Sequence, residues 1–139
     1  MKKQLQQLWN FQSAYNSTRN TTPTLLPADE YQLRYRLGKE ELDEYLEACK
    51  DDDLIEVADA LADQLYILLG TMISHGMGDV MEDIFDDVHR SNMSKLGEDG
   101  KPIYREDGKI LKGPNFSKPN IAKYLSDNGQ LEIPFNETI

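Results

Sequence analysis

Two acidic stripes on neighbouring helical patterns constrain this chain more than any other feature of its sequence. The first is Glu40-Glu41-Leu42-Asp43-Glu44, and the second runs from Glu56 to Asp63. Residues 40–63 hold eleven acidic residues and one basic residue, Lys50. So many like charges repel one another unless a cation or solvent absorbs them. Any fold of this chain must therefore place these carboxylates in water or around a cation.

The apolar residues around the stripes predict an all-α protein with about four main helices. Their spacing is helical in four segments separated by breaks rich in Pro, Gly, Asn or Asp. The segments are residues 3–15, 28–50, 54–74 and 80–93. Asp53 and Asp79 are expected to cap the third and fourth helices, and Ala28-Asp29-Glu30 the second. The wide apolar stripe of residues 54–74 needs a bundle interior to cover it. We therefore expect an antiparallel helix bundle with 54–74 at its core.

The C-terminal third has a different pattern. Residues 101–105 and 109–112 flank Glu106-Asp107-Gly108, which predicts a small β-hairpin around a turn. A short helix is expected at 120–125, followed by a loosely held tail. With 139 residues there is room for one ordinary domain. We therefore interpret 1–139 as a single domain, with a helical core over about 3–95 and the hairpin and tail over 96–139.

Net charge excludes two classes of partner. A formal charge of −10 disfavours nucleic acid polymers and anionic membranes, because both attract a basic surface. The charge is uneven, since residues 95–123 hold seven basic and four acidic side chains. Such a distribution suits a protein whose acidic centre binds a metal ion while the mildly cationic segment binds an anion beside that metal.

Cysteine content and hydrophobicity indicate the compartment. The single cysteine, Cys49, excludes a disulfide framework and falls on the apolar face of a helical pattern, where we expect it to pack in the core. No run of about 18 consecutive apolar residues is present, and the N-terminus lacks a signal-peptide pattern. A cytoplasmic location is expected.

The two acidic helices bring their carboxylates together if they pair antiparallel. With a turn near residues 51–52, facing residues have numbers that add to about 103. Glu44 then faces Asp59, Glu40 and Glu41 come level with Asp63, and Glu47 meets Glu56 nearer the turn. Carboxylate oxygens on rigid helices are ligands that Mg²⁺ prefers, and Mn²⁺ accepts the same donors. The predicted metal ligands are Glu41, Glu44, Asp59, Asp63 and Glu56. The alternative is a solvated helix face without a ligand.

These residues resemble the all-α nucleoside triphosphate pyrophosphohydrolases, which include MazG-like proteins, dimeric dUTPases and phosphoribosyl-ATP pyrophosphohydrolase. The signature of that family is Glu-Glu-x-x-Glu, followed on the next helix by Glu-x-x-Asp. Residues 40–44 match the first half. For the second half, alignment on Asp63 leaves Ala60 in the place of Glu, with Asp59 as its substitute, whereas Glu56-Val57-Ala58-Asp59 supplies both acids one turn earlier. The resemblance spans about residues 5–121.

The resemblance implies an activity, a cofactor and an assembly. Such proteins cleave a nucleoside triphosphate between its α and β phosphates with Mg²⁺, giving the monophosphate and pyrophosphate, as house-cleaning or control of a nucleotide pool. They are homodimers or homotetramers, which predicts a homo-oligomer here. Glu40 or Glu44 would position the attacking water as the catalytic carboxylate. The alternatives are a non-catalytic acidic bundle that binds a cation or a partner protein, and another phosphoester hydrolase with two-metal chemistry.

A triphosphate also needs cations and base contacts. The candidates for phosphate, ribose or base binding are Arg90, Asn92, Lys95, Lys112, Asn115 and Arg34. Aromatic side chains that could stack on the base are Trp9, Phe11, Tyr15 and Phe116. For those in the first helix, core packing is the competing interpretation.

Overall fold

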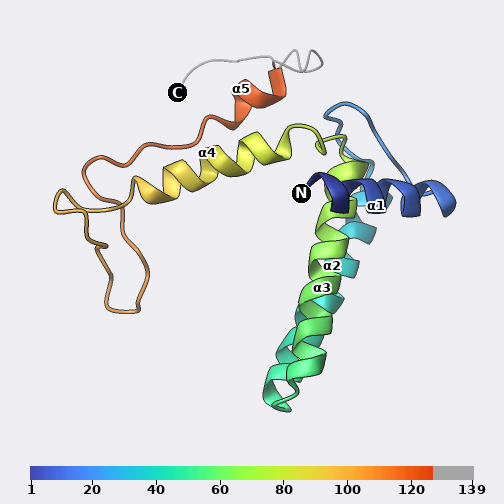
Figure 1. Ribbon diagram of the computed structural model, residues 1–139, viewed down its shortest axis with the longest axis horizontal. Helices are drawn as coiled ribbons and strands as arrows, with labels where there is room; N and C mark the ends of the chain where they lie inside the picture. The colour runs from blue at the N-terminus through green and yellow to red at the C-terminus, as the bar shows by residue number, and fades with distance from the viewer. Residues whose placement is uncertain (127–139) are drawn as a thin grey trace. The chain divides into compact units, whose positions relative to one another are not determined.

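The computed structural model describes residues 1–126, and its helices follow the predicted order (Figure 1). The helices are α1 (Lys2–Ala14), α2 (Ala28–Lys50), α3 (Leu54–Ser74), α4 (Met81–Met93) and α5 (Ile121–Ser126). Their ends agree with the predicted ends to within one residue. The all-α class is therefore confirmed for the described residues. The predicted loose tail from 127 onward lies outside them.

The chain divides into two compact units, Met1–Asp79 and Val80–Ile139. The first contains α1, α2 and α3, and the second contains α4 and α5. The single domain over residues 1–139 stays a prediction.

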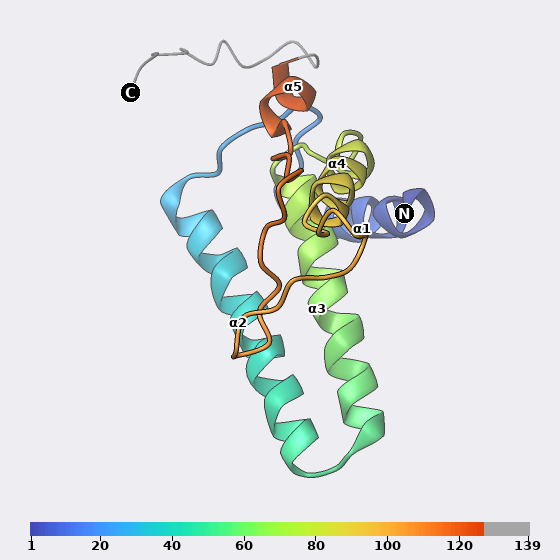
Figure 2. The same cartoon turned by 90° about the vertical axis from the view of Figure 1, so that its left-hand side faces the viewer.

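In the first unit, α2 and α3 form the antiparallel hairpin that the sequence predicts (Figure 2). The guanidinium of Arg34 donates to the carbonyl of Ile67 at 2.7 Å, and the Gln64 amide donates to the carbonyl of Glu41 at 3.3 Å. These pairings place the two helices in the register predicted from a turn near residues 51–52. The predicted facing of the acidic stripes follows from this register.

Asp53 begins α3 as predicted. Its carboxylate accepts from the backbone N–H groups of Ile55 and Glu56 at 3.0 and 3.1 Å, which satisfies two donors that a helix start leaves open. The other two expected caps are wrong. Pro27 precedes α2 and Val80 precedes α4, and neither helix has a side-chain cap. Asp79 lies one residue too early to cap α4, because the helix begins at Met81.

The buried core of the first unit is small and lies where α1 crosses the C-terminal part of α3. It consists of Leu8, Leu69 and Ile73, with Leu5, Trp9 and Met72 packed against it. Gln12 fastens the two helices, because its amide donates to the carbonyl of Gly70 at 3.1 Å and to the Ser74 hydroxyl at 3.0 Å. With only 13 residues, α1 covers one end of α3.

The rest of the apolar stripe on α3 is uncovered, so the expectation that a bundle interior covers it is wrong for this unit by itself. Leu61, Leu65 and Leu68 are each about half exposed. The expected burial of Cys49 is also wrong, because this cysteine is exposed near the end of α2.

A groove of about 700 Å³ runs between α2 and α3 on the side of the exposed leucines of α3, with Tyr31, Leu42 and Leu65 among its lining residues. We call this side the apolar face.

By length and composition alone, α3 could cross a membrane, with a mean hydropathy of 1.2 over its most apolar window. The core helix of a soluble protein passes the same test. The cytoplasmic location stays a prediction.

In the second unit, Arg90 ties the segment before α5 to α4. Its guanidinium donates to Asp87 at 2.7 Å, to the Ser117 hydroxyl at 3.0 Å and to the Lys118 carbonyl at 3.0 Å. Asp87 also accepts from the backbone N–H of Asn120 at 2.6 Å. The hydrogen bond from Arg90, and then that from Asn120, lowers the pKa of Asp87. These contacts fix residues 117–120 against α4.

The predicted β-hairpin is wrong as a sheet element. A single antiparallel bridge joins Tyr104 to Ile110, and no strand forms in the described residues. The turn itself is present, since the Arg105 N–H donates to the Lys109 carbonyl at 2.8 Å. Two extended segments without a third strand or a packed face do not sustain a longer ladder. Tyr104 and Ile110 are accordingly 61% and 50% exposed.

Candidate active site

The carboxylate of Glu41 is the centre of the candidate site. Its side chain is half-buried, and Oε2 is buried without a hydrogen-bond partner among the described residues. Burial raises the pKa of Glu41, and the nearby charges of Glu44, Asp63, Glu40 and Asp59 raise it further. Five of the predicted acids, from α2 and α3, are therefore near enough for their charges to interact.

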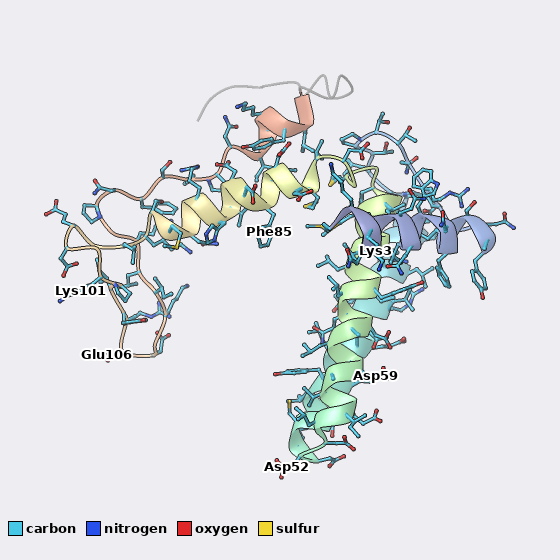
Figure 3. The ribbon with its side chains drawn as sticks, in the orientation of Figure 1. Lys3, Asp52, Asp59, Phe85, Lys101 and Glu106 are labelled. Atoms are coloured by element: carbon cyan, nitrogen blue, oxygen red, sulfur yellow. The ribbon has the colours of Figure 1, made fainter. Side chains whose placement is uncertain are left out.

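A second group of acids lines a cavity of about 410 Å³ between this centre and the hairpin turn. Its lining residues are Glu44, Glu47, Ala48, Asp51, Asp53, Glu56, Asp59 and Ala60. Asp59 lies on α3 above the turn residue Asp52, as the side chains of Figure 3 show. Glu44 and Asp59 belong to the group around Glu41 as well as to this cavity. These two residues thus connect the acids around Glu41 with the acids that line the cavity.

The acids of the site differ from their neighbours in their ion pairs. Asp43 pairs with Lys39, and Glu47 pairs with Lys50 at 2.6 Å. Within the described part of the chain, no Lys or Arg forms an ion pair with Glu41, Glu44 or Asp59. Their repulsion is thus not compensated by an ion pair within residues 1–126. A cation, or the water around a solvated helix face, would have to balance the charge of these acids.

The donor set fits a hard divalent cation. Carboxylate oxygens are the preferred ligands of Mg²⁺, and the unpartnered Oε2 of Glu41 is a buried acceptor that a cation would satisfy. In the described residues, no three Asp, Glu, His or Cys side chains gather closely enough to hold a metal as they stand. Binding would therefore require the carboxylates to turn toward one another.

Ala60 bears on the two alignments of the family signature. This residue is 4% exposed and is one of the residues that line the acidic cavity. Glu56 and Asp59 line the same cavity. Asp63 is among the charges that raise the Glu41 pKa. Both predicted alignments therefore place an acid of α3 beside the acids of α2.

Arg34 is not placed with the carboxylates. Its guanidinium donates to the Thr71 hydroxyl at 2.9 Å and to the Ile67 carbonyl at 2.7 Å, and it lines the groove of the apolar face. Burial lowers the pKa of Arg34. Gly70 makes room for it, because a Cβ there would lie 2.7 Å from Nη2 of Arg34. In this structure Arg34 joins α2 to α3, and its predicted contact with substrate stays a prediction.

The other substrate-binding candidates belong to the second unit, and the contacts of Arg90, Lys95 and Lys112 described here lie within that unit. Arg90 uses its guanidinium on Asp87, Ser117 and Lys118, as described above. Lys95 donates to the Asn92 side chain at 2.6 Å, and Lys112 lies over the Phe116 ring at 4.5 Å. Asn115 is exposed. Their roles in phosphate or base binding stay predictions.

Sequence reasoning did not name Tyr66 as a site residue. The ring of Tyr66 lies edge-on to Phe11, with 5.4 Å between centroids, and Phe11 lies 4.5 Å from Tyr15. The signal that could have found it is helical spacing, because Tyr66 follows Asp59 and Asp63 on one face of α3.

Comparison with known proteins gives one family. The model of the family described as phosphoribosyl-ATP pyrophosphohydrolase matches residues 8–92. This range includes all the predicted acids, Arg34, Arg90 and Asn92, whereas Lys95, Lys112 and Asn115 lie beyond it. A solved chain from Exiguobacterium sp. 255-15, provisionally named an NTP pyrophosphohydrolase, is 24% identical, with a TM-score of 0.45 over 90% of this chain and 92% of that one. The curated proteins give no match. Because the family model matches more than half of the sequence, this chain belongs to the phosphoribosyl-ATP pyrophosphohydrolase family.

Proposed function

We propose that this protein hydrolyses a nucleoside triphosphate between its α and β phosphates in a reaction that depends on Mg²⁺. The products are a nucleoside monophosphate and pyrophosphate. The observation that carries the proposal is the environment of Glu41, a half-buried carboxylate with an unpartnered oxygen among four further acids. Membership of a family of pyrophosphohydrolases supports the reaction type. Removal of unwanted nucleotides, or control of a nucleotide pool, is the corresponding cellular role.

The acids have separable roles in this proposal. Glu41, Glu44 and Asp59 would hold the cation, together with Asp63 or Glu56 on the same helix. The bound cation supplies positive charge that neutralises the triphosphate and its transition state. Mn²⁺ is expected to substitute, since it accepts the same oxygen ligands.

The remaining chemistry belongs to the attacking water molecule and to a carboxylate that acts as its general base. Glu40 or Glu44 would accept a hydrogen bond from a water molecule and orient its oxygen toward the α phosphorus. As the new P–O bond forms, the bond from the α phosphorus to the oxygen that bridges to the β phosphate breaks. The water proton passes to the carboxylate, and the bridging oxygen leaves with pyrophosphate. The atoms balance without any further reactant.

Product analysis tests this proposal directly. The protein is incubated with Mg²⁺ and a panel of standard and modified nucleoside triphosphates, and the products are separated by chromatography. We expect monophosphate and pyrophosphate in equal amounts, with no turnover in the presence of a chelator and recovery with Mn²⁺. Diphosphate and phosphate would contradict the cleavage site. If the folded protein consumes no member of the panel, the result would favour the non-catalytic acidic bundle. The lack of activity would then be explained by Ala60, which stands where the family signature has Glu.

We also propose that a second copy of this chain covers the apolar face. The face carries Leu42, Leu61, Leu65 and Leu68, all about half exposed, which a soluble protein rarely leaves in water as one patch. It extends along two helices of more than 20 residues, or roughly 30 Å by 20 Å. That footprint approaches the ~800 Å² per partner of a standard interface. Two acidic chains repel elsewhere, so this largely uncharged side is where two copies can meet.

Leu65→Lys is therefore expected to convert the oligomer to monomer. The substitution places a charge at the middle of the proposed interface, where it would be buried without a partner. Sedimentation equilibrium measures the change in mass. Leu25→Lys is the matched control, because Leu25 is 86% exposed in the loop before α2 and is expected to leave the mass unchanged. A monomeric wild-type protein, or a Leu65→Lys protein of unchanged mass, would contradict the proposal.

A further inference from the structure

Three aromatic side chains form an exposed cluster on the first unit. Phe11 and Tyr15 come from α1 and its C-terminal end, and Tyr66 comes from α3. The Phe11 ring lies 4.5 Å from Tyr15 and 5.4 Å from Tyr66, in tilted and edge-on arrangements. The exposed fractions are 41% for Phe11, 69% for Tyr15 and 37% for Tyr66. Aromatic surface is therefore left open to solvent at one place. We call these three residues the aromatic platform.

The aromatic platform continues the acidic stripe of α3. Tyr66 lies three residues after Asp63 and seven after Asp59, so all three share one face of the helix. Along the helix axis, Tyr66 is roughly 5 Å beyond Asp63 and 10 Å beyond Asp59. A nucleotide with its phosphates at the carboxylates would thus reach the platform with the far end of the molecule, which is the base.

Buried contacts fix the spacing between the two helices of the platform. Gln12, which follows Phe11, is 2% exposed and donates to Gly70 and Ser74 of α3. These hydrogen bonds hold α1 on α3 independently of any ligand. The rings are therefore positioned in advance, which lowers the entropy cost of stacking a base on them.

The other aromatic candidates are already occupied by protein contacts. Trp9 packs against the core of Leu8, Leu69 and Ile73, and the guanidinium of Arg19 lies 5.6 Å from its ring centroid. The Phe116 ring carries the Lys112 ammonium at 4.5 Å. Of the four rings named from the sequence, Phe11 and Tyr15 remain, and Tyr66 joins them.

We infer that the aromatic platform binds the nucleobase of the substrate by stacking. The inference rests on the proposed function, because that function supplies the nucleotide. Partly exposed aromatic rings suit any planar base, because every base has a flat face that can stack on a ring, whereas the carboxylates repel the phosphates unless a cation intervenes. The platform thus recognises the base of the nucleotide, and the acidic site recognises its phosphates through the cation.

Binding measurements separate the platform from catalysis. The probes are the α,β-imido analogues of the standard nucleoside triphosphates, which are not cleaved at this bond, and inorganic tripolyphosphate, which lacks a base. Both are titrated calorimetrically with Mg²⁺ present. Phe11→Leu and Tyr66→Leu are expected to weaken binding of the preferred analogue about 5- to 150-fold, the range for losing one stacked ring. Binding of tripolyphosphate should not change.

Two further variants control for folding and for aromatic surface in general. Tyr66→Phe keeps the ring and should retain binding. Tyr104→Leu removes a ring that is 61% exposed in the second unit and should have no effect. Unchanged analogue binding in both Leu variants would overturn the inference even if the wild-type protein turns over nucleotides. Equal weakening of the analogue and of tripolyphosphate would also overturn it. Selective loss of the analogue without any wild-type turnover would support the platform and contradict the proposed reaction.

Discussion

Replacing Glu41 with Gln is expected to lower kcat for nucleoside triphosphate hydrolysis on the order of 10²- to 10³-fold, the scale seen when one preorganised electrostatic group is lost. Glutamine keeps the shape of the side chain and removes the charge that would attract the cation. The same change should raise the melting temperature of the metal-free protein, because it removes one of five mutually repelling carboxylates. Loss of activity together with a gain in stability distinguishes a functional acid from a structural one.

The raised pKa of Glu41 gives this prediction a pH dependence. A carboxyl whose pKa is higher in the folded protein binds its proton more tightly there than in the unfolded chain. The metal-free wild-type protein should therefore lose stability as pH rises from the ordinary glutamate pKa through the folded pKa. Glu41→Gln should flatten this part of the profile, and Mg²⁺ should oppose the loss. Thermal melts across pH, with and without Mg²⁺, measure both effects.

Asp43→Asn is the matched control for Glu41→Gln. Asp43 belongs to the same acidic stripe but pairs with Lys39 and is well exposed. It is expected to leave kcat unchanged and to shift the melting temperature little, because exposed ion pairs contribute little to stability. Equal activities for the Glu41→Gln and wild-type proteins would contradict the assignment of Glu41. So would a Glu41→Gln protein whose lost activity is accompanied by lost stability.

The helices and their register could be predicted because the signals for them are local. Apolar spacing located α2 and α3, Asp53 marked the start of α3, and the short turn between them left one antiparallel pairing. Exposure of Cys49 and of the apolar face could not be predicted in the same way. Burial depends on what packs against a helix, and α1 reaches only one end of α3.

In the candidate site too, the residues that could be predicted are those placed by local signals. The acids around Glu41 follow from helical spacing and the hairpin register, both of which are local. Arg34 was assigned from charge alone, and its actual partners, Thr71 and Ile67, depend on side-chain packing between helices. Arg90 likewise has partners 27 and 28 residues further along the chain, Ser117 and Lys118, which no spacing in the sequence indicates. Long-range polar contacts are thus the part of this site that sequence patterns do not contain.

The loop that follows α1 is held against the C-terminal end of α3 by backbone hydrogen bonds. The N–H of Asn20 donates to the carbonyl of Ile73 at 3.1 Å, and that of Thr24 to the carbonyl of His75 at 2.8 Å. Gly76 ends α3 with a φ of +69°. A Cβ at this position would lie 1.9 Å from the carbonyl oxygen of Thr22. Both the backbone conformation and the close approach of the loop therefore require glycine here.

Gly76→Ala is consequently expected to be among the most damaging single substitutions in the first unit. The left-handed conformation costs about 1–3 kcal/mol for a residue with a side chain. The overlap with Thr22 adds to this, because backbone atoms have to move and the hydrogen bonds of Asn20 and Thr24 with them. A total above about 4 kcal/mol would reach the exceptional end of single-substitution effects. In a cooperative unit of 60–100 residues this would lower the melting temperature by roughly 16–32 °C.

Gly78→Ala, two residues further along, separates this mechanism from a general intolerance of the segment. A Cβ at Gly78 meets nothing within 4 Å, and Gly78 is not among the residues with positive φ. Alanine there should be neutral or slightly stabilising, because it restricts the unfolded chain. Calorimetric or circular-dichroism melts of the two variants make the comparison. Similar melting temperatures for Gly76→Ala and Gly78→Ala would mean that the loop moves away from the added Cβ without a loss of stability. This result would contradict the expectation that the close approach of the loop stabilises the C-terminal end of α3.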